Sequence, residues 1–570
     1  MADPLLTLRP RLEAAIQAAF GPDYAGTDPV LRRSDKADYQ ANAAMALAKR
    51  VGQPPRDVAT AIVEHADLAD LVPSVEVAGP GFINLTLTGE FLGTCVADTT
   101  APRAEHPETV VVDYSGPNVA KEMHVGHLRS TCIGDSLVRV LELLGHTVIR
   151  QNHIGDWGTQ FGMLIEHLLD LGWASGGDHS IADLNALYQE AQAKFRGDAN
   201  FAERARQRVV ALQGGDPETL AIWRELVAES ERHFDAVYER LGVRLTADDI
   251  CAESFYNPVL DEVAAELEGK GLARIDDGAL CVFPAGFAGR DGEPLPLIVR
   301  KSDGGYGYQA TDLAAARYRT TELHGDRLVY VVGSPQAQHL AMVIAVARMA
   351  GWLDDGRRAE HVAFGSILGD DKKPFKTRSG ENVKLIELLD EAVERAAAVV
   401  AEKNPELDAA TRTEVARQVG IGAVKYADLA NDRVKDYVFD WDRMLSFDGN
   451  TAPYLQYACV RSRSILRRAA DEGAFPGPIS IDAPAERALA LQLVSFDEIV
   501  EATADNLQPH RLAGYLFELA QAFTSFFEAC PVLRADTEEQ RASRLALCEV
   551  TASTLSRGLE LLGIEAPARM

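Results

Sequence analysis

Three consecutive valines, Val110 to Val112, place the strongest constraint on how this 570-residue chain can fold. A run of β-branched residues without polar alternation is typical of a strand that is buried on both faces, as in a parallel sheet. A turn with Gly116 and Pro117 follows, then an amphipathic helical stretch at 127–144 and a second apolar strand at 147–151. Strand, helix and strand in this order predict a right-handed β-α-β unit.

Two later segments extend the predicted sheet. Residues 327–332 and 361–367 are again apolar and rich in β-branched side chains, so we expect two more strands. A long segment at roughly 170–300 separates them from the first unit, which predicts a parallel sheet split by an insertion. Ligands of open parallel sheets bind outside the carboxyl ends of the strands.

The regions on either side of this sheet predict two further domains. Residues 5–20 form an amphipathic helical stretch, and residues 75–87 alternate and turn at 79–81, as paired strands do. A stretch with two prolines, 99–109, is a candidate linker. We therefore expect domains at 1–105, 106–385 and 386–570, and long helices without a fixed repeat at 414–429, 452–472, 485–506, 510–529 and 538–562.

Composition excludes several classes of protein. With 47% hydrophobic and 25% charged residues the chain is an ordinary globular one, and no stretch approaches the about 18 apolar residues of a membrane span. The first ten residues do not resemble a secretory signal. Seven scattered cysteines without a C-x-x-C pair favour reduced thiols in the cytoplasm. A net charge of -28 argues against a general nucleic-acid binder, so a nucleic acid would have to bind at local basic patches.

Most of the candidate chemistry lies in residues 113–131, DYSGPNVAKEMHVGHLRST. His124 and His127 flank Gly126 where the helix is expected to begin. A helix N-terminus offers free N–H groups and a positive dipole end, which together form an anion site. Gly126 leaves room for a flat ligand such as adenine, and Lys121 adds a cation. We therefore predict that ATP binds at His124, Gly126 and His127.

Metal binding and helix capping are alternative roles for the two histidines. Their spacing can hold a metal ion, but no third ligand is near in the sequence, so we expect no metal site. They can also be ordinary capping residues of the helix. No G-x-G-x-x-G opens the helix, which leaves a dinucleotide site unsupported.

The stretch His124-Val125-Gly126-His127 resembles the HIGH signature of class I aminoacyl-tRNA synthetases, and its context resembles that of arginyl-tRNA synthetases. The family's Ser-Pro-Asn triplet is here Gly116-Pro117-Asn118, so a serine contact is missing while Asn118 remains. HIGH alone is shared with other nucleotidyl transferases, but the motifs match in order along nearly the whole chain. The further matches are NHIGDWGTQ at 152–160, KSDGGY at 301–306, Tyr308, DLA at 312–314, FKTRS at 375–379 and LGI at 562–564.

This resemblance implies an α/β catalytic domain with a split Rossmann-like parallel sheet. A small α+β N-terminal domain that contacts tRNA and an all-α bundle that binds the anticodon accompany it. It implies an arginine–tRNA ligase that activates L-arginine with ATP and Mg²⁺ and transfers it to the 3' end of tRNA-Arg. It also implies a cytoplasmic monomer without a tightly bound cofactor or a membrane partner.

An arginine substrate needs a carboxylate and several neutral acceptors, since guanidinium is permanently charged and has five donors. Asp312, at the expected start of a helix at 312–319, is the candidate carboxylate, and Tyr308 offers a phenol. Gln336 follows the strand at 327–332. The resemblance implies that these three residues line the arginine pocket with Asn118 and His127. A capping aspartate and a core tyrosine are the alternatives.

The second class I signature, KMSKS, is replaced by residues 372–380, KKPFKTRSG, which carry four cations. The resemblance implies that Lys121 and Lys376 share the role of the missing lysine on the leaving pyrophosphate, and we expect Arg378 to assist. A plain surface run of charges is the alternative.

Basic and aromatic residues of the predicted bundle suit phosphate contact and base stacking. A solvated helix face is the alternative for this row. The weaker candidates in the N-terminal domain come from a match at 38–42. The predicted tRNA-binding residues are Tyr39, Gln40, Tyr454, Arg461 and Arg463.

Two other functions remain open. A small-molecule nucleotidyl transferase would share the His-x-Gly-His site, but it would not need the long helical region or the N-terminal domain. A non-catalytic tRNA-binding relative would be expected to have lost His124, His127 or Lys121, and all three are present.

Overall fold

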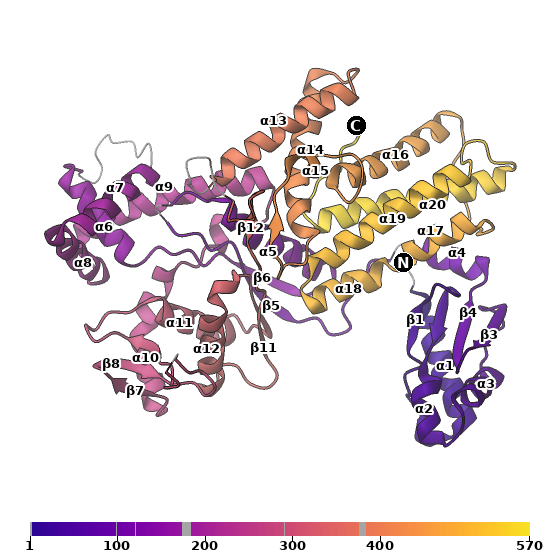
Figure 1. Ribbon diagram of the computed structural model, residues 1–570, viewed down its shortest axis with the longest axis horizontal. Coiled ribbons are helices and arrows are strands. Elements are labelled where there is room, and N and C mark those ends of the chain that lie inside the picture. The colour runs from indigo at the N-terminus through magenta and orange to yellow at the C-terminus, as the bar shows by residue number, and fades with distance from the viewer. Residues whose placement is uncertain (1–2, 99, 120, 174–183, 290, 376–382) are drawn as a thin grey trace.

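The structure is a computed structural model that describes all residues except 1–2, 99, 120, 174–183, 290 and 376–382. Its elements form an N-terminal α+β unit, a central parallel sheet with its insertion, and a helical bundle (Figure 1). The N-terminal unit lies at one end of the molecule, and the helices α6 (Thr159–Asp170), α7 (Leu184–Gly197) and α8 (Ala199–Gln213) lie at the other. This arrangement confirms the predicted fold class, while the exact domain boundaries stay predictions.

The N-terminal unit is a four-stranded antiparallel sheet of order β1-β2-β4-β3 with helices packed against it. The predicted helix at 5–20 and the predicted hairpin at 75–87 are confirmed. Gly81 has a φ of 142°, and a Cβ there would lie 2.6 Å from the Pro55 carbonyl oxygen, so the turn requires glycine. The elements are α1 (Pro4–Phe20), η1 (Pro22–Tyr24), β1 (Leu31–Arg33), β2 (Tyr39–Ala41), α2 (Ala43–Val51), α3 (Pro55–His65), β3 (Ser74–Ala78), β4 (Phe82–Thr86) and α4 (Gly89–Ala97).

The central sheet is parallel and has the order β11-β10-β5-β6, as the β-α-β pattern predicted. Val110 and Val112 belong to one hydrophobic core and Val111 to another, which explains why this strand has no polar alternation. The strands are β5 (Thr109–Asp113), β6 (Thr147–Gln151), β10 (Arg327–Tyr330) and β11 (Arg358–His361), and the helices beside them are α5 (Val125–Leu143), α11 (Tyr308–Thr321), η4 (Ser334–Gln336) and α12 (Ala337–Met349).

The predicted strand at 361–367 is wrong. The edge strand β11 ends at His361. The chain stays beside the β10 segment as far as Phe364, which bridges Gly333, and Gly365 then donates its N–H to the Arg433 carbonyl at 2.9 Å. β12 (Ile367–Leu368) pairs instead with β13 (Tyr437–Val438). The apolar pattern missed the strand Arg358–His361, because an edge strand tolerates polar residues.

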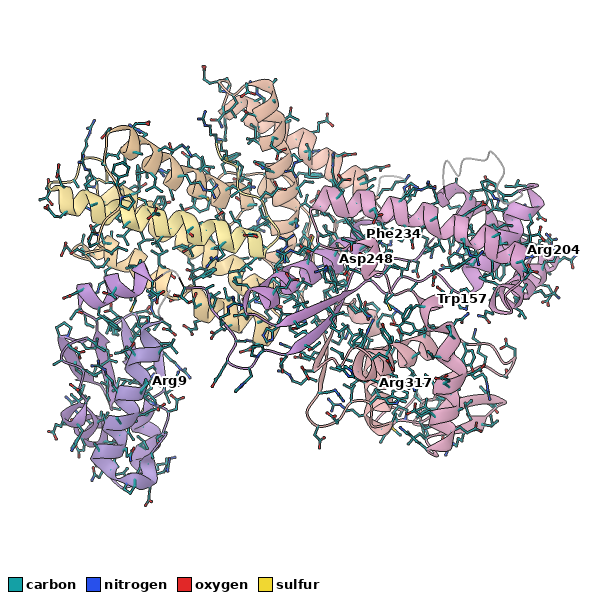
Figure 2. The ribbon with its side chains drawn as sticks, turned by 180° about the vertical axis from the view of Figure 1, so that it is seen from behind. Arg9, Trp157, Arg204, Phe234, Asp248 and Arg317 are labelled. Carbon is teal, nitrogen blue, oxygen red and sulfur yellow. The ribbon has the colours of Figure 1, made fainter. Side chains whose placement is uncertain are left out.

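The insertion combines helices with a small antiparallel sheet of order β7-β8-β9. Figure 2 shows Trp157 between the helix that carries Phe234 and the helix that carries Arg317, so the insertion borders the region of α11. Its elements are α6 (Thr159–Asp170), α7 (Leu184–Gly197), α8 (Ala199–Gln213), α9 (Pro217–Leu241), η2 (Ala247–Asp249), η3 (Glu253–Val259), α10 (Leu260–Gly269), β7 (Ala273–Asp276), β8 (Ala279–Val282) and β9 (Leu297–Arg300).

The C-terminal region is helical, as predicted, but the expected helix at 485–506 is two helices. They meet at Ser495, whose hydroxyl accepts a hydrogen bond from Arg33 of β1 at 2.9 Å, so the break coincides with a contact to the N-terminal unit. The helices are α13 (Leu385–Lys403), α14 (Ala409–Leu429), α15 (Trp441–Met444), α16 (Ala452–Asp471), α17 (Pro484–Val494), α18 (Phe496–Asn506), α19 (Pro509–Ala529) and α20 (Glu538–Leu561).

Two sequence expectations about the whole chain can be checked within the described residues. All seven cysteines lie in this part, and each is a buried free thiol. No described helix is both long and apolar enough to cross a membrane.

A buried ion pair joins helix α5 to the bundle. Arg129 of α5 places its Nε 2.8 Å from Oδ1 of Asp428 in α14, and both side chains are at most 1% exposed. Arg129 also donates to the Lys435 carbonyl at 2.9 Å. A charge that is buried this deeply depends on its partner, because neither group can turn to water.

We expect Asp428→Asn to lower the free energy of unfolding by about 3–5 kcal/mol, because it leaves the Arg129 guanidinium buried without a counter-charge. Urea unfolding monitored by circular dichroism measures this loss. Asp432→Asn is the matched control, since Asp432 faces a largely exposed Lys435 at 4.0 Å and should cost under about 1 kcal/mol. Equal effects of the two changes would contradict a structural role for the buried pair.

Candidate active site

A cavity of about 520 Å³ opens at the carboxyl ends of β5 and β10, where ligands of parallel sheets are expected. It brings together His124, Gly126 and His127 with Asn118, Tyr308, Asp312 and Gln336, all of which were predicted from the sequence. The other residues that line it are Asp113, Tyr114, Ser115, Gly116, Ser130, His153, Gly155, Glu253, Tyr330, Val331, Val332, Gly333, His339, Leu340 and Phe364.

The two histidines of the signature form a capping box at the N-terminus of α5. The Gly126 N–H donates to Nδ1 of His124 at 3.0 Å, and the His124 N–H donates to Nδ1 of His127 at 3.0 Å. Since each Nδ1 accepts, the proton of each neutral ring must sit on Nε2. The capping role therefore leaves both Nε2–H groups as donors for a ligand, and capping and phosphate binding do not exclude each other.

Both imidazoles are neutral at pH 7. Burial, followed by the charge of nearby groups that include Lys121, lowers the pKa of His124 and brings the pKa of His127 to about 3. The rings lie 4.1 Å apart between centroids. A Cβ at position 126 would lie 2.7 Å from Cε1 of His124, so Gly126 is required for this packing. The site can offer hydrogen bonds and a helix dipole to an anion without carrying a formal charge itself.

The turn between β5 and α5 is held by side chains from several elements. Ser115 has a φ of 71°, which is uncommon for a residue other than glycine, and its N–H donates to the Ser130 hydroxyl at 2.9 Å. Gly155 approaches Asn118 closely, since a Cβ there would lie 2.2 Å from the Asn118 Oδ1. The Asn118 amide is thus placed at the cavity wall by a partner that only glycine can provide.

Asp312 lies between two histidines inside the cavity. Its Oδ2 is 2.5 Å from Nε2 of His339, and its Oδ1 is 3.4 Å from Nε2 of His153. Burial alone would raise the pKa of Asp312, but the hydrogen bonds and charges of His153 and His339 hold it well below its ordinary value. Asp312 is therefore an ionised carboxylate within the site.

The helix that carries Asp312 starts earlier than we predicted. α11 begins at Tyr308 after Gly307, so the expected start at residue 312 is wrong and Asp312 lies in the second turn. The alternative that Asp312 is only a capping residue does not fit this position. The Tyr308 side chain is 55% exposed, so it is not a core tyrosine, and its ring lies 4.9 Å from that of His339.

Two further acidic groups line the cavity and were not predicted. Asp113 is paired with the buried Arg319, whose NH2 group lies 2.9 Å from its Oδ2. Glu253 is held at the wall by its own N–H, which donates to the Ile154 carbonyl at 3.0 Å. Burial raises the pKa of Glu253 to about 7. With Asp312, the cavity wall carries three carboxyl groups, of which Asp113 is already paired with Arg319.

The sequence carried a signal for His153 but none for Glu253. His153 lies two residues after the end of β6, and a residue just beyond a parallel strand is expected at the ligand edge. Glu253 lies in the insertion and reaches the cavity because the chain near Ile250 bridges to Asn152. Such a long-range contact has no local pattern in the sequence.

The structure describes only one of the three cationic side chains that were predicted to contact the phosphates. Lys121 is not among the residues that line the cavity, and its Nζ lies 4.7 Å from the centre of the Tyr188 ring. Lys376 and Arg378 lie outside the described residues. The roles of these three residues stay predictions. In the described part of the chain, no group of three or more His, Cys, Asp or Glu side chains could hold a metal ion.

The predicted tRNA contacts also need revision. The Tyr39 side chain is 2% exposed in the core of the N-terminal unit, so a direct contact through this side chain is wrong. Gln40 donates to Asn84 at 2.8 Å on the same sheet. Arg463 donates to Ser556 at 2.8 Å and to the Pro567 carbonyl at 3.4 Å, which ties down the C-terminal segment.

Arg461 and Tyr454 are half-buried and pack against aromatic rings of α19. The Arg461 guanidinium carbon lies 4.1 Å from the centre of the Phe527 ring, and Tyr454 packs edge-on against Phe517 at 5.7 Å. Tyr457, on the same helix α16, is 44% exposed. Cations and aromatic faces of this kind are typical of single-stranded nucleic-acid sites.

The chain matches three family models along its length. They are described as tRNA synthetases class I (R), catalytic domain, over residues 94–441, DALR anticodon binding domain over 455–570, and Arginyl tRNA synthetase N terminal domain over 6–87. The three matches follow the order of the three regions of the fold.

Relatives and solved structures agree with these models. The arginine–tRNA ligase of Thermobifida fusca is 56% identical over 100% of both chains, and that of Proteus mirabilis is 49% identical over 99% of each. The arginyl-tRNA synthetase of Plasmodium falciparum has a TM-score of 0.84 at 29% identity and 100% coverage of both chains. The arginyl-tRNA synthetase of Thermus thermophilus has a TM-score of 0.83 at 29% identity, covering 99% of this chain and 100% of that one. With a signature helix, an ionised carboxylate and full-length similarity of this extent, the chain belongs to the arginine–tRNA ligases of the class I aminoacyl-tRNA synthetases.

Proposed function

We propose that the cavity at the carboxyl ends of β5 and β10 is where arginine, ATP and the 3' end of tRNA-Arg react. The observation that carries this proposal is that one cavity holds both an anion site and a cation site. His124 and His127 offer donors at a helix N-terminus, and Asp312 offers an ionised carboxylate. The substrates of this reaction need both, because ATP is an anion and arginine carries a guanidinium.

In the first step the arginine carboxylate attacks the α-phosphorus of ATP, arginyl-adenylate forms and pyrophosphate leaves. Both the nucleophile and the leaving group are already ionised, so catalysis rests on positioning and on stabilising charge on the phosphate oxygens. His124 and His127 do this through Nε2–H groups whose orientation the capping box sets. Gly126 lets the His124 ring pack against the helix start.

The guanidinium of arginine is proposed to bind Asp312, with Tyr308 and Gln336 as neutral partners. Glu253 is a second acidic group on the same wall. Asn118 and His127 lie nearer the signature helix, where they can orient the amino and carboxylate groups of the amino acid. A competing amino acid without a guanidinium would leave these polar groups unpaired, which is a source of specificity in binding itself.

In the second step the terminal ribose hydroxyl of tRNA attacks the carbonyl carbon of arginyl-adenylate, and AMP leaves. Lys121, Lys376 and Arg378 are proposed to neutralise the phosphates in the first step. Mg²⁺ is proposed to arrive on the triphosphate of ATP. Asp113 and Asp312 are already paired with Arg319 and with histidines, which fits a metal ion carried by the nucleotide rather than by protein ligands.

The tRNA contacts and the oligomeric state of the chain are proposed as follows. Gln40 of the N-terminal unit and Tyr454 and Arg461 of α16 are the proposed tRNA contacts. Family resemblance supports a monomer in the cytoplasm. Light scattering of the purified chain tests the monomer, since a dimer would have about twice the mass of 61.8 kDa.

His124→Asn separates the two roles of His124. Asparagine keeps an acceptor that can cap the helix, but it removes the Nε2–H donor. We expect kcat to fall by roughly 10²–10³ with an unchanged melting temperature, the scale of losing one preorganised transition-state contact. His124→Ala should show the same loss of kcat together with about 1 kcal/mol of lost stability. Normal kcat in the Asn variant would remove His124 from the phosphate site.

Asp312→Asn keeps the shape of the side chain and removes its charge. Stripping the partner from a buried cation typically costs about 3–5 kcal/mol, so KM for arginine should rise by roughly 10²–10³ while KM for ATP barely changes. Steady-state kinetics with each substrate varied in turn measures this split. A normal KM for arginine beside a lowered melting temperature would assign Asp312 a purely structural role.

Arg461→Ala should reduce the salt dependence of tRNA binding. Each lost phosphate contact lowers the slope of log affinity against log salt by about one unit. Filter binding of tRNA-Arg at several salt concentrations gives the slope. Arg463→Ala is the matched control on the same helix, because its guanidinium already bonds to Ser556, and we expect it to lower stability instead. An unchanged slope for Arg461→Ala would leave this row as a solvated helix face.

A further inference from the structure

The two ring nitrogens of His153 both face hydrogen-bond acceptors. Nδ1 lies 3.0 Å from the carbonyl oxygen of Cys251, and Nε2 lies 3.4 Å from Oδ1 of Asp312. A carbonyl oxygen and an ionised carboxylate have no proton to donate. These two contacts favour hydrogen on both nitrogens, which makes His153 an imidazolium cation in the protein without arginine.

The surroundings of His153 support this charge. Burial alone would lower the pKa of His153, but the hydrogen bond and charge of Asp312 and the charge of Asp113 outweigh it and raise the pKa to about 9. Arg319 opposes the cation, while Tyr256 packs its ring 5.7 Å away. The titratable groups that face His153 from the neighbouring elements are Asp312, Asp113, Arg319, Glu253, Asp156, Cys251 and Tyr256.

The Asp312 carboxylate is thus already paired with histidines before arginine binds. Its Oδ1 faces His153, and its Oδ2 contacts His339. A guanidinium that binds this carboxylate becomes a second cation beside the imidazolium, and like charges a few ångströms apart disfavour the charged form of the titratable group. His153 can relieve this by losing the Nε2 proton, since Nδ1–H keeps its bond to Cys251.

We infer that His153 is a positioning residue that acts as a proton-linked counter-ion of Asp312: it neutralises the carboxylate in the empty site and releases one proton when the arginine guanidinium replaces it. The Nε2–H bond breaks, its electron pair stays on the ring, and the proton passes to solvent. One cation enters as one proton leaves. This inference rests on the proposed binding of the guanidinium by Asp312.

The exchange favours a cationic ligand over a neutral one of the same shape. Citrulline has a neutral ureido group where arginine has its guanidinium, so it cannot replace the charge of His153 at Asp312. We expect citrulline to bind more weakly than arginine and to release no proton. The pair of Asp312 and His153 then contributes to the choice of arginine without His153 touching the substrate.

Titration calorimetry of the full chain with arginine at pH 8, in two buffers of different ionisation enthalpy, counts the protons released. At pH 8 Glu253, with a pKa of about 7, is already ionised, while His153 is still protonated. We expect about one proton per arginine for the unchanged chain and none for His153→Gln, which keeps an N–H donor toward Asp312. Subtracting the proton count of His153→Gln from that of the unchanged chain removes any contribution from the amino group of arginine itself.

The pH dependence of affinity gives an independent reading. If a proton leaves on binding, the Kd for arginine should fall by up to about tenfold between pH 7 and pH 8. In His153→Gln the Kd should change by no more than about twofold over this range, because Glu253, with a pKa of about 7, still ionises there. A role of His153 in stability alone would weaken binding equally at both values and leave the slope unchanged.

Several outcomes would overturn the inference. One is that the unchanged chain releases no proton on binding arginine, or releases as much with citrulline. Another is that proton release persists in His153→Gln, or disappears in His339→Gln but not in His153→Gln. The melting temperature shows whether His153→Gln folds. If it does not fold, the numbers of protons that the unchanged chain releases with arginine and with citrulline still test the inference. Normal arginine affinity in Asp312→Asn would sink the pocket assignment itself. Weakened affinity there, without proton release in the unchanged chain, would overturn only the role of His153.

Discussion

The start of helix α5 depends on a pair of hydrogen bonds in which backbone N–H groups donate to imidazole rings. These bonds fix the ring orientation and the tautomer of His124 and His127, and burial keeps both rings neutral. A phosphate therefore meets N–H donors and a helix dipole that are set before it binds. Such preorganisation costs no rearrangement at the moment of reaction. The remaining parts of the site are arranged around this helix start.

Helix α5 also connects the regions of the molecule. Two residues after the signature, Arg129 pairs with Asp428 of the bundle. Two turns further, Asp135 accepts the backbone N–H of Arg244 from the insertion at 2.7 Å, close to the fully buried Lys425 of α14. The helix that offers its N-terminus to the phosphates is thus held by buried polar contacts along its length.

The cavity balances its charges in pairs. Asp113 faces Arg319, and Asp312 faces His153 and His339. Glu253 has a raised pKa because burial disfavours its charged form. An incoming guanidinium changes this balance, since it adds a permanent charge that cannot be lost. The titratable partners must then respond, and this is the physical basis for coupling between arginine binding and protonation.

The sequence by itself determined the architecture and most of the site, because local patterns carry both. The valine run predicted β5 and the parallel sheet. Seven of the motif residues line one cavity, namely Asn118, His124, Gly126, His127, Tyr308, Asp312 and Gln336, whereas Lys121 does not. Tertiary structure alone decided what depends on distant partners. It buried Tyr39, directed Arg463 to the C-terminal segment and brought Glu253 from the insertion to the cavity wall. It also surrounded Asp312 with histidines that are remote in the chain, and charge pairing of this kind follows from three-dimensional proximity, which spacing along the sequence does not encode.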